Sequence, residues 1–303
     1  MLIQSLYNQI LQKISFPKIS IITPNFNGSQ YLEETVLSVL CQGYPNLEYI
    51  IIDGGSTDNS VEIIKKYEKH LKYWVSEPDE GMYHAIQKGF ERSTGEIMAW
   101  INSDDMYHKN SFFTVAEIFD SLPSVNWIQG ASTSFDESGR TVYVHQSRRF
   151  GRVDFINHDF KWIQQESVFW RRSLWEKAGS NVNMNLKYAG DFALWLKFFS
   201  YEKLYVTHAL VGGFRWRRSN QITIDHFEDY LIEVENLLTT LEVSKKDLKI
   251  LSRYKKILAV QKNIRRLRLF RTEWITNRYR EKHFELGKYI IFNRFSAKFV
   301  IAG

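Results

Sequence analysis

Short apolar runs alternate with stretches of helical spacing between residues 19 and 101, and this alternation limits the fold more than any other feature of the chain. The runs predicted as strands are 19–23, 48–53, 73–76 and 96–101, and the stretches predicted as helices are 31–41, 59–70 and 82–92. Strands that alternate with helices favour a mostly parallel sheet with helices on both faces. The sequence therefore predicts an α/β fold.

A polar loop follows each of the four predicted strands. The loops are TPNFNG (23–28), DGGSTD (53–58), EPDEG (77–81) and NSDD (102–105). Ligands of open α/β sheets bind beyond the carboxyl ends of the strands. We therefore expect the four loops to form a single site.

The chain has 303 residues, of which 44% are hydrophobic, so it can bury a sizeable core. At roughly 100 to 200 residues per domain, this length suggests one large domain with an appendage. We expect a helical lead-in (1–17), a body (18–222) and a helical, basic C-terminal extension (223–303). The aromatic-rich part of the body, from residue 125, is expected to mix short strands with helices.

The positive charge of the chain is concentrated in one segment. The formal net charge is +6, but residues 244–283 alone carry +11 and the rest of the chain sums to −5. Such asymmetry is typical of proteins with an anionic partner. Lys and Arg interleaved with apolar residues over 244–301 predict an anionic membrane surface as that partner. The alternative is a solvated helical face whose apolar side packs on the body.

The remaining composition excludes several classes of protein. A single cysteine excludes an intramolecular disulfide framework and a cysteine-based zinc cluster. No run of 18 apolar residues occurs, and the first residues lack the pattern of a signal peptide. We expect a cytoplasmic protein. If the basic segment binds the membrane, the protein would be peripheral on the inner face of the cell membrane.

Two adjacent carboxylates, Asp104 and Asp105, end the fourth predicted strand. A divalent cation is the usual compensation for such a repulsive pair, and oxygen ligands favour Mg²⁺ or Mn²⁺. A solvated turn or a helix cap is the alternative. Asp53 ends a neighbouring strand, where its carboxylate could accept a hydrogen bond from a nucleobase or a ribose. The alternative is that Asp53 caps the next helix, although Asp58 suffices for that cap.

The motifs together resemble those of a family 2 glycosyltransferase with the GT-A fold. They are PNFNG (24–28), DGGSTD (53–58), SEPDEGMY (76–83) and NSDD (102–105), in this order and spacing. The second and third are similar to those of the bacterial branch that includes colanic-acid-type polysaccharide transferases. The resemblance covers about residues 18–220 and implies a nucleotide-binding half (18–124) and an acceptor half (125–222).

The resemblance also implies a role for individual residues. Donor-binding residues would be Thr23, Pro24, Asn25, Asp53, Asp79, Asn102, Ser103 and Asp104, with Asp104 and Asp105 at the metal; Gln165, Glu166 and Trp195 would lie on the acceptor side. Asn102 replaces the first carboxylate of the family's Asp-x-Asp motif, which should weaken metal affinity. Asp191 matches the general base of inverting members. It opens a helix-like run (192–199), where the helix dipole favours the anion; a helix cap is the alternative.

One departure from the family lies late in the body. The family's Phe-Arg-x-His pattern appears here as Phe214-Arg215-Trp216-Arg217, which places a permanent cation where relatives have an imidazole. Arg215 and Arg217 are expected to bind the diphosphate directly, as guanidinium groups do. A basic edge strand is the alternative.

The implied function is inverting transfer of a sugar from a nucleoside diphosphate donor to a hydroxyl of a glycan or polyprenyl-linked acceptor in bacterial surface polysaccharide synthesis. A nicotinamide-dependent oxidoreductase would show Gly-x-Gly-x-x-Gly after the first strand, and this sequence does not. A sugar nucleotidyltransferase is an alternative, although the Gly-rich basic loop of such enzymes is absent. A non-enzymatic nucleic-acid-binding protein would use the basic segment but leaves the carboxylate cluster unexplained, so no nucleic acid is expected.

Overall fold

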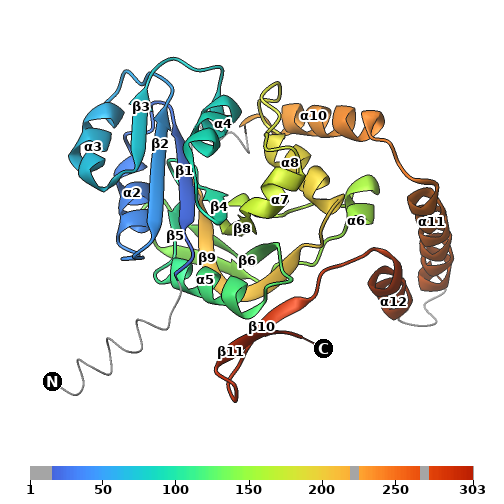
Figure 1. Cartoon of the computed structure of the whole chain (residues 1–303). Helices are drawn as coiled ribbons and strands as arrows, with labels where there is room; N and C mark the ends of the chain where they lie inside the picture. The colour runs from blue at the N-terminus through green and yellow to red at the C-terminus, as the bar shows by residue number, and fades with distance from the viewer. Residues whose placement is uncertain (1–15, 219–224, 267–272, 303) are drawn as a thin grey trace.

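We describe the protein from a computed structural model, which describes residues 16–218, 225–266 and 273–302 (Figure 1). Most of the predicted lead-in (1–17) and the predicted boundary at residue 222 lie outside the described residues.

Four parallel strands form the N-terminal half of the central sheet. They are β1 (Ile19–Asn25), β2 (Leu47–Asp53), β3 (Tyr73–Ser76) and β4 (Ile97–Trp100), in the order β3-β2-β1-β4. Each lies within a few residues of its predicted range. All residues of β1 and β4 are buried, as expected for a parallel strand covered on both faces.

Three helices connect these strands, namely α2 (Leu32–Leu40), α3 (Ser60–Tyr67) and α4 (Met82–Arg92); a short 3₁₀ turn (Glu68–His70) follows α3. The chain moves outward from β1 to β3 and then returns to the far side of β1 as β4. Right-handed crossovers therefore place α2 and α3 on one face of the sheet and α4 on the other (Figure 1). The strand order reverses between β1 and β4, which is where α/β sheets bind ligands.

The second half of the sheet is mixed. Its main strands are β6 (Trp127–Phe135), β8 (Val168–Arg171) and β9 (Tyr205–Arg215), with short strands β5 (Met106–Tyr107) and β7 (Thr141–His145) at its margins. Strand β8 runs antiparallel to both β4 and β6 and so joins the two halves. The helices of this half are α5 (Ser111–Ser121), α6 (Arg152–Ile156), α7 (Arg172–Lys177) and α8 (Gly190–Phe199), and a 3₁₀ turn (Gln165–Ser167) precedes β8.

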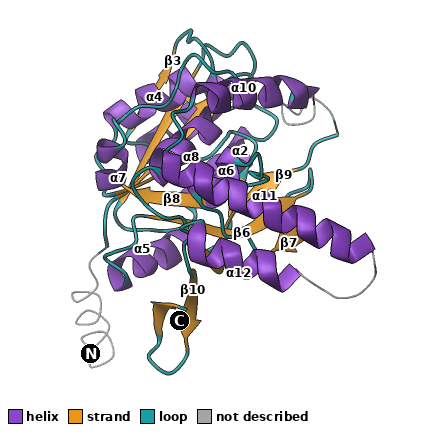
Figure 2. Ribbon diagram, turned by 90° about the vertical axis from the view of Figure 1, so that its right-hand side faces the viewer, coloured by secondary structure: helices purple, strands orange, loops and turns teal. Residues whose placement is uncertain are grey.

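The C-terminal extension is helical only in part. Helices α10 (Phe227–Thr240), α11 (Lys245–Arg266) and α12 (Glu273–His283) confirm the predicted helical, basic character. The segment beyond them forms two strands that the sequence analysis did not predict. Strand β10 (Tyr289–Asn293) pairs in parallel with β9, and β11 (Lys298–Ile301) pairs with β10 at the edge of the sheet (Figure 2). Among the described residues no helix is long and apolar enough to cross a membrane.

The extension packs against the body through a small apolar cluster. Leu251 and Tyr254 of α11 are each 7% exposed and pack with Val153 of α6 and with Phe284. Arg280 of α12 pairs with the buried Asp154 of α6 at 2.9 Å. The apolar side of α11 therefore lies in part on the body, as the alternative interpretation of this segment anticipated.

Candidate donor and acceptor site

Asp53 ties the carboxyl ends of the first three strands together. Its two carboxylate oxygens accept hydrogen bonds from Asn25 Nδ2 (2.6 Å), Ser56 N (2.9 Å), Ser56 Oγ (2.5 Å) and Ser76 Oγ (2.6 Å). Burial opposes ionisation, yet these donors hold the pKa of Asp53 below its usual value. Asp53 is 0% exposed and its lone pairs are in use, so its predicted direct contact with the nucleotide is not supported. It positions the loops instead.

The two loops that follow β1 and β2 are bonded to each other. Asn27 Oδ1 accepts the backbone N–H of Thr57 at 2.8 Å, and Asn27 N donates to Ser56 Oγ at 2.8 Å. Between these contacts Phe26 stands 67% exposed. A large aromatic face held open above a polar site suits a nucleobase. Phe26 lies within the PNFNG motif, and no role was predicted for it from the sequence.

Asp79 closes the site from the loop after β3. A Cβ at Gly54 would lie only 2.9 Å from Asp79 Oδ2, so glycine is what allows this close approach. Asp79 is half-buried and accepts the N–H of Gly81 at 2.8 Å. Asp79 is thus accessible at the rim, and its contact with the donor stays a prediction.

Asp104 and Arg217 form an ion pair across the site. Arg217 Nη2 lies 3.0 Å from Asp104 Oδ2, and the two side chains are 22% and 21% exposed. Arg217 follows the end of β9, and Asp104 lies in the loop after β4. Burial raises the pKa of Asp104, and the charge of Arg217 opposes that rise. Both predicted residues therefore reach the surface of the same site.

Arg215, by contrast, is completely buried. Its guanidinium pairs with Glu34 at 2.7 Å and donates through Nε to the Asp104 carbonyl at 2.6 Å. It lies over the ring of Tyr31 with its Cζ 4.7 Å from the ring centroid. With 0% exposure Arg215 has no surface for a diphosphate, so its predicted donor contact was wrong. It fixes the loop that carries Asp104.

Asp105 points inward. Its Oδ1 accepts the backbone N–H of Arg215 at 2.7 Å, and it is 1% exposed. Burial and the neighbouring charges of Asp104 and Glu166 raise its pKa well above the usual value, and burial raises the pKa of Glu166 to about 7. The Asp105 carboxyl therefore lies in the interior, beside that of Glu166.

These contacts allow a test of the predicted Mg²⁺ or Mn²⁺ site. Asp105 is 1% exposed and turned inward toward the Arg215 N–H, so it is a poor ligand, and Asn102 offers an amide where a second carboxylate would stand. Over the described ranges, no three His, Cys, Asp or Glu side chains come together to hold a metal. Asp104 alone remains, and Arg217 already neutralises it. A divalent ion 4 Å from a guanidinium is repelled by about 2 kcal/mol in water and about 8 kcal/mol at an effective dielectric of 20. The residues present do not fit a divalent metal.

Asp191 lies in the first turn of α8. Its Oδ1 accepts the backbone N–H of Phe192 at 2.7 Å, and its own N–H points to the Tyr83 hydroxyl at 3.4 Å. The Tyr83 ring packs over Gly190, where a Cβ would lie 2.6 Å from the ring. Burial raises the pKa of Asp191 to about 6, although backbone donors oppose the rise. We expected the helix dipole to favour the anion; burial is the larger effect.

The turn before Asp191 is held by the C-terminal extension. Glu233 of α10 accepts the backbone N–H groups of Lys187 (2.8 Å), Tyr188 (2.9 Å) and Ala189 (2.8 Å). Three donors at the N-terminal end of α8 thus meet one carboxylate from another helix. The sequence analysis missed Glu233, because nothing local marks an acidic residue on an amphipathic helix as the cap of a distant one.

The predicted acceptor-side residues are mostly internal. Gln165 is 7% exposed, and its Nε2 donates to the Trp100 carbonyl at 2.6 Å. Trp195 is 2% exposed, and its ring stacks on Trp100 and Trp127 at centroid distances of 5.8 and 5.6 Å. Trp195 is a core residue, and its predicted acceptor role was wrong.

The partly exposed members of the predicted set mark where a substrate has access. They are Asp79, Asn102, Ser103, Asp104, Asp191 and Arg217, whereas Thr23, Pro24, Asn25, Asp53, Asp105, Gln165, Glu166, Trp195 and Arg215 are buried. Thr23 shares a hydrogen bond with the Tyr49 hydroxyl at 3.0 Å, so it belongs to the support of the site.

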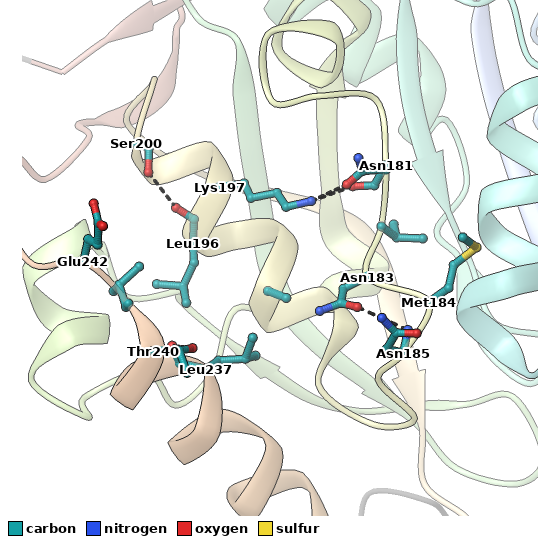
Figure 3. Close-up of a pocket in the computed structure, with 13 residues that line it drawn as sticks. Asn181, Asn183, Met184, Asn185, Leu196, Lys197, Ser200, Leu237, Thr240 and Glu242 are labelled. Carbon is teal, nitrogen blue, oxygen red and sulfur yellow. Dashed lines mark hydrogen bonds between the residues drawn. The ribbon is translucent and has the colours of Figure 1, made fainter.

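A separate cavity of about 550 Å³ lies between loop 181–185, α8 and the end of α10 (Figure 3). Its lining residues on α8 are Ala193, Leu196, Lys197 and Ser200, which share one helix face. Asp191 is two positions before Ala193, about 200° around the helix, so it lies on a different face. The cavity is therefore distinct from the site that contains Asp191 and Asp104.

The fold, with its carboxylate-lined site at the β1–β4 switch point, is an α/β fold with the arrangement of GT-A glycosyltransferases. The family model for Glycosyl transferase family 2 matches residues 20–203, so the chain belongs to that family.

Relatives and solved structures agree with this assignment. An uncharacterised glycosyltransferase of Rickettsia prowazekii is 27% identical over 206 residues, 66% of this chain and 64% of that protein. TuaG of Bacillus subtilis, a putative teichuronic acid biosynthesis glycosyltransferase, is 40% identical over 99 residues, which are 31% of this chain and 38% of TuaG. The chain spans less than two thirds of the length of the curated Rickettsia relatives.

Two solved structures share the fold. The 1–349 fragment of Staphylococcus aureus TarS, solved with UDP-GlcNAc, matches with a TM-score of 0.60 and 17% identity over 75% of this chain and 68% of the fragment. The mannosyltransferase PcManGT of Pyrobaculum calidifontis, solved with GDP-Man and Mn²⁺, matches with a TM-score of 0.59 and 17% identity over 82% of this chain and 74% of its own.

Proposed function

We propose that the protein transfers a sugar from a nucleoside diphosphate donor to a hydroxyl acceptor with inversion at the anomeric carbon. One observation supports this proposal above all: the site combines two features. The first is the ion pair of Asp104 with Arg217, at the position proposed for the diphosphate, and the second is a partly exposed carboxylate, Asp191, whose pKa is about 6. The sugar nucleotidyltransferase and nucleic-acid alternatives gain no support from these contacts.

The reaction requires a nucleophile and a stabilised leaving group. The acceptor oxygen attacks the anomeric carbon and forms the new glycosidic bond, while the bond from that carbon to the diphosphate oxygen breaks and its electron pair leaves with the diphosphate. Asp191 takes the acceptor proton, a step that contributes roughly 10² to 10⁴-fold in general base catalysis. The cationic group of the site stabilises the charge on the departing diphosphate.

The nucleotide is held by the loops of the first half. Phe26 offers its exposed face to the base, and Asp79 and Ser103 line the rim. Asp53 and Asn25 support this arrangement from below. TarS and PcManGT, which share the fold, were solved with UDP-GlcNAc and GDP-Man, and this supports a sugar nucleotide as the donor class.

The acceptor is proposed to be a glycan or a polyprenyl-linked sugar of a bacterial surface polysaccharide. The similarity to TuaG supports a polysaccharide. The basic helices α11 and α12 support an acceptor presented at an anionic membrane surface.

A screen of UDP-, GDP- and dTDP-sugars tests the proposed activity. A donor at 100 times its dissociation constant should stabilise the protein by about 2.7 kcal/mol, which a thermal-shift assay detects. The same donor should be hydrolysed slowly to the nucleoside diphosphate. Salt-sensitive binding of RNA or DNA, with neither stabilisation nor hydrolysis, would instead favour a nucleic-acid-binding protein.

A further inference from the structure

We infer that Arg217, oriented by Asp104, is the cation that binds the diphosphate, and that nucleotide binding by this chain does not depend on a divalent metal. This inference rests on the proposed function and names the group that does the work at the diphosphate position.

The position of Arg217 is fixed by the loop that it faces. Arg215 Nε donates to the Asp104 carbonyl at 2.6 Å, and Arg215 N donates to Asp105 Oδ1 at 2.7 Å, so the end of β9 is tied to the loop after β4. Two residues later Arg217 meets the Asp104 side chain at 3.0 Å. The guanidinium therefore lies at the β1–β4 switch point, beside the loops assigned to the nucleotide.

The chemistry of a guanidinium suits this task. A guanidinium is cationic, and its planar fork of N–H donors matches phosphate oxygens in a bidentate manner. At 22% exposure Arg217 is open to a ligand yet partly shielded from water, which strengthens its attraction for an anion.

The nearby groups make a metal ion the weaker candidate. A divalent ion would need anionic ligands, and Asn102 is neutral while Asp105 is 1% exposed and faces Arg215 and Glu166. Asp104 is the remaining carboxylate of the motif, and an ion bound to it would lie next to the positive charge of Arg217. Arg215 is not an alternative cation, because it is 0% exposed and paired with Glu34.

Calorimetric binding of UDP, GDP and dTDP to the full chain, in EDTA and in Mn²⁺, tests the inference. We expect at least one of these nucleotides to bind. Its dissociation constants in the two buffers should agree within about threefold, which is roughly half of the free-energy change that a tenfold difference represents. Arg217→Ala should weaken binding at least about tenfold in both buffers, and Mn²⁺ should not restore it. Arg217→His should make binding respond to Mn²⁺, because an imidazole is a metal ligand.

Arg218→Ala is the matched control. Arg218 is 93% exposed and pairs with Glu137 at 3.6 Å, so its loss should leave nucleotide binding unchanged. Melting temperatures of all variants show whether each has folded, and Arg217→Lys, which keeps the charge but not the fork, should bind with an affinity between those of the wild type and Arg217→Ala.

The outcomes separate this inference from the proposed function. Wild-type binding that is lost in EDTA and restored by Mn²⁺ overturns the inference and leaves the proposed function standing. Absence of binding by all three nucleotides in both buffers overturns both. Equal binding in the two buffers together with full binding by Arg217→Ala would show that a different group holds the diphosphate.

Discussion

Three aspartates of the site have pKa values shifted in different directions because their partners differ. Asp53 accepts four hydrogen bonds, which hold its pKa low despite complete burial. Asp105 faces other carboxyls, and burial with their charge raises its pKa well above the usual value. Backbone N–H bonds oppose the effect of burial at Asp191, and burial leaves its pKa at about 6. A carboxyl with a pKa of about 6, as in Asp191, is suited to accept a proton near neutral pH.

The first prediction concerns the pH dependence of turnover. A carboxyl with a pKa of about 6 is protonated below that pH and accepts no proton, so kcat should rise with pH through about 6 and level off above it. Asp191→Asn should lower kcat by roughly 10² to 10⁴-fold and leave donor binding intact. Steady-state kinetics between pH 5 and 8, with calorimetric donor binding, measure both.

Glu166→Gln is the control for this assignment, because the pKa of Glu166 is about 7. If protonation of Asp191 causes the fall in kcat at low pH, the midpoint of that fall should stay near pH 6 in Glu166→Gln. Loss of this pH dependence in Glu166→Gln, or near-normal turnover by Asp191→Asn, would remove Asp191 as the base.

The second prediction concerns Phe26, which is 67% exposed beside the nucleotide loops. Stacking of a base on an aromatic ring contributes about 1–3 kcal/mol, so Phe26→Ala should weaken nucleotide binding roughly 5- to 150-fold. Phe26→Trp keeps an aromatic face and should bind as well as the wild type. Equal affinity of Phe26→Ala and the wild type in a calorimetric titration would exclude stacking on this ring.

At the scale of elements, α10 and α8 act as a unit. Glu233 on α10 binds three successive N–H groups just before α8, and Asp191 stands in the first turn of α8. The turn that leads to the proposed base is therefore held by a helix that lies beyond the matched family region, which ends at residue 203.

The third prediction tests this coupling with Glu233→Ala. Hydrogen bonds to a charged group contribute about 1.5–3 kcal/mol each, so the variant should lower the melting temperature and loosen the turn at 187–189. We expect kcat to fall while the affinity for donor stays unchanged, since the donor loops lie elsewhere. Glu235→Ala is the matched control, because Glu235 is 57% exposed and pairs only with His158 among the described ion pairs. Equal kcat for the two variants would deny Glu233 a positioning role.

The elements that the sequence predicted well are those with a local signal. Strands β1 to β4 are apolar runs covered on both faces, and α2 to α4 show helical spacing, so each could be located to within a few residues. Strands β10 and β11 could not be located in this way. They are strands because Ile290 is buried in the core and β10 pairs with β9 at a sheet edge, and both contacts are long-range.

The candidate site likewise has features that the sequence predicted and features that depend on long-range packing. The order of motifs predicted which loops come together, because strand ends meet at one edge of a parallel sheet. Exposure was not predictable from the motifs. Arg215 and Arg217 are two residues apart on one strand end, yet the first is buried against Glu34 and the second reaches the site. The contacts of Arg215 with Glu34 of α2 and with the ring of Tyr31 distinguish the two, and both are long-range.

At the scale of the whole molecule, some charged residues of the C-terminal extension form ion pairs with the body. Arg280 pairs with Asp154, and Arg152 of the body pairs with Asp247 of α11 at 3.7 Å. Other cations of α11 are exposed, among them Lys249, Arg253 and Lys256, which are spaced four and three apart on one helix face. Exposed apolar groups lie on the same extension, including Val260 at 58%, Trp274 at 62% and Phe295 at 104%. This combination supports the proposed contact with an anionic membrane.

The last prediction tests that contact without removing the extension, because β10 is part of the central sheet and truncation would disturb the fold. Each Lys or Arg near an anionic surface contributes about 1 kcal/mol, so changing Lys249, Arg253 and Lys256 to Ala together should weaken vesicle binding by about 3 kcal/mol, roughly 150-fold. The exposed lysines Lys69, Lys72 and Lys109 of the body, changed to Ala together, give the same change in net charge and serve as the control. Co-sedimentation with phosphatidylglycerol vesicles should separate the two variants, weaken with added salt and vanish with phosphatidylcholine vesicles. Equal binding by the two triple variants would mean that the vesicles attract net charge and not this helix, and no binding by the wild type would remove the membrane contact altogether.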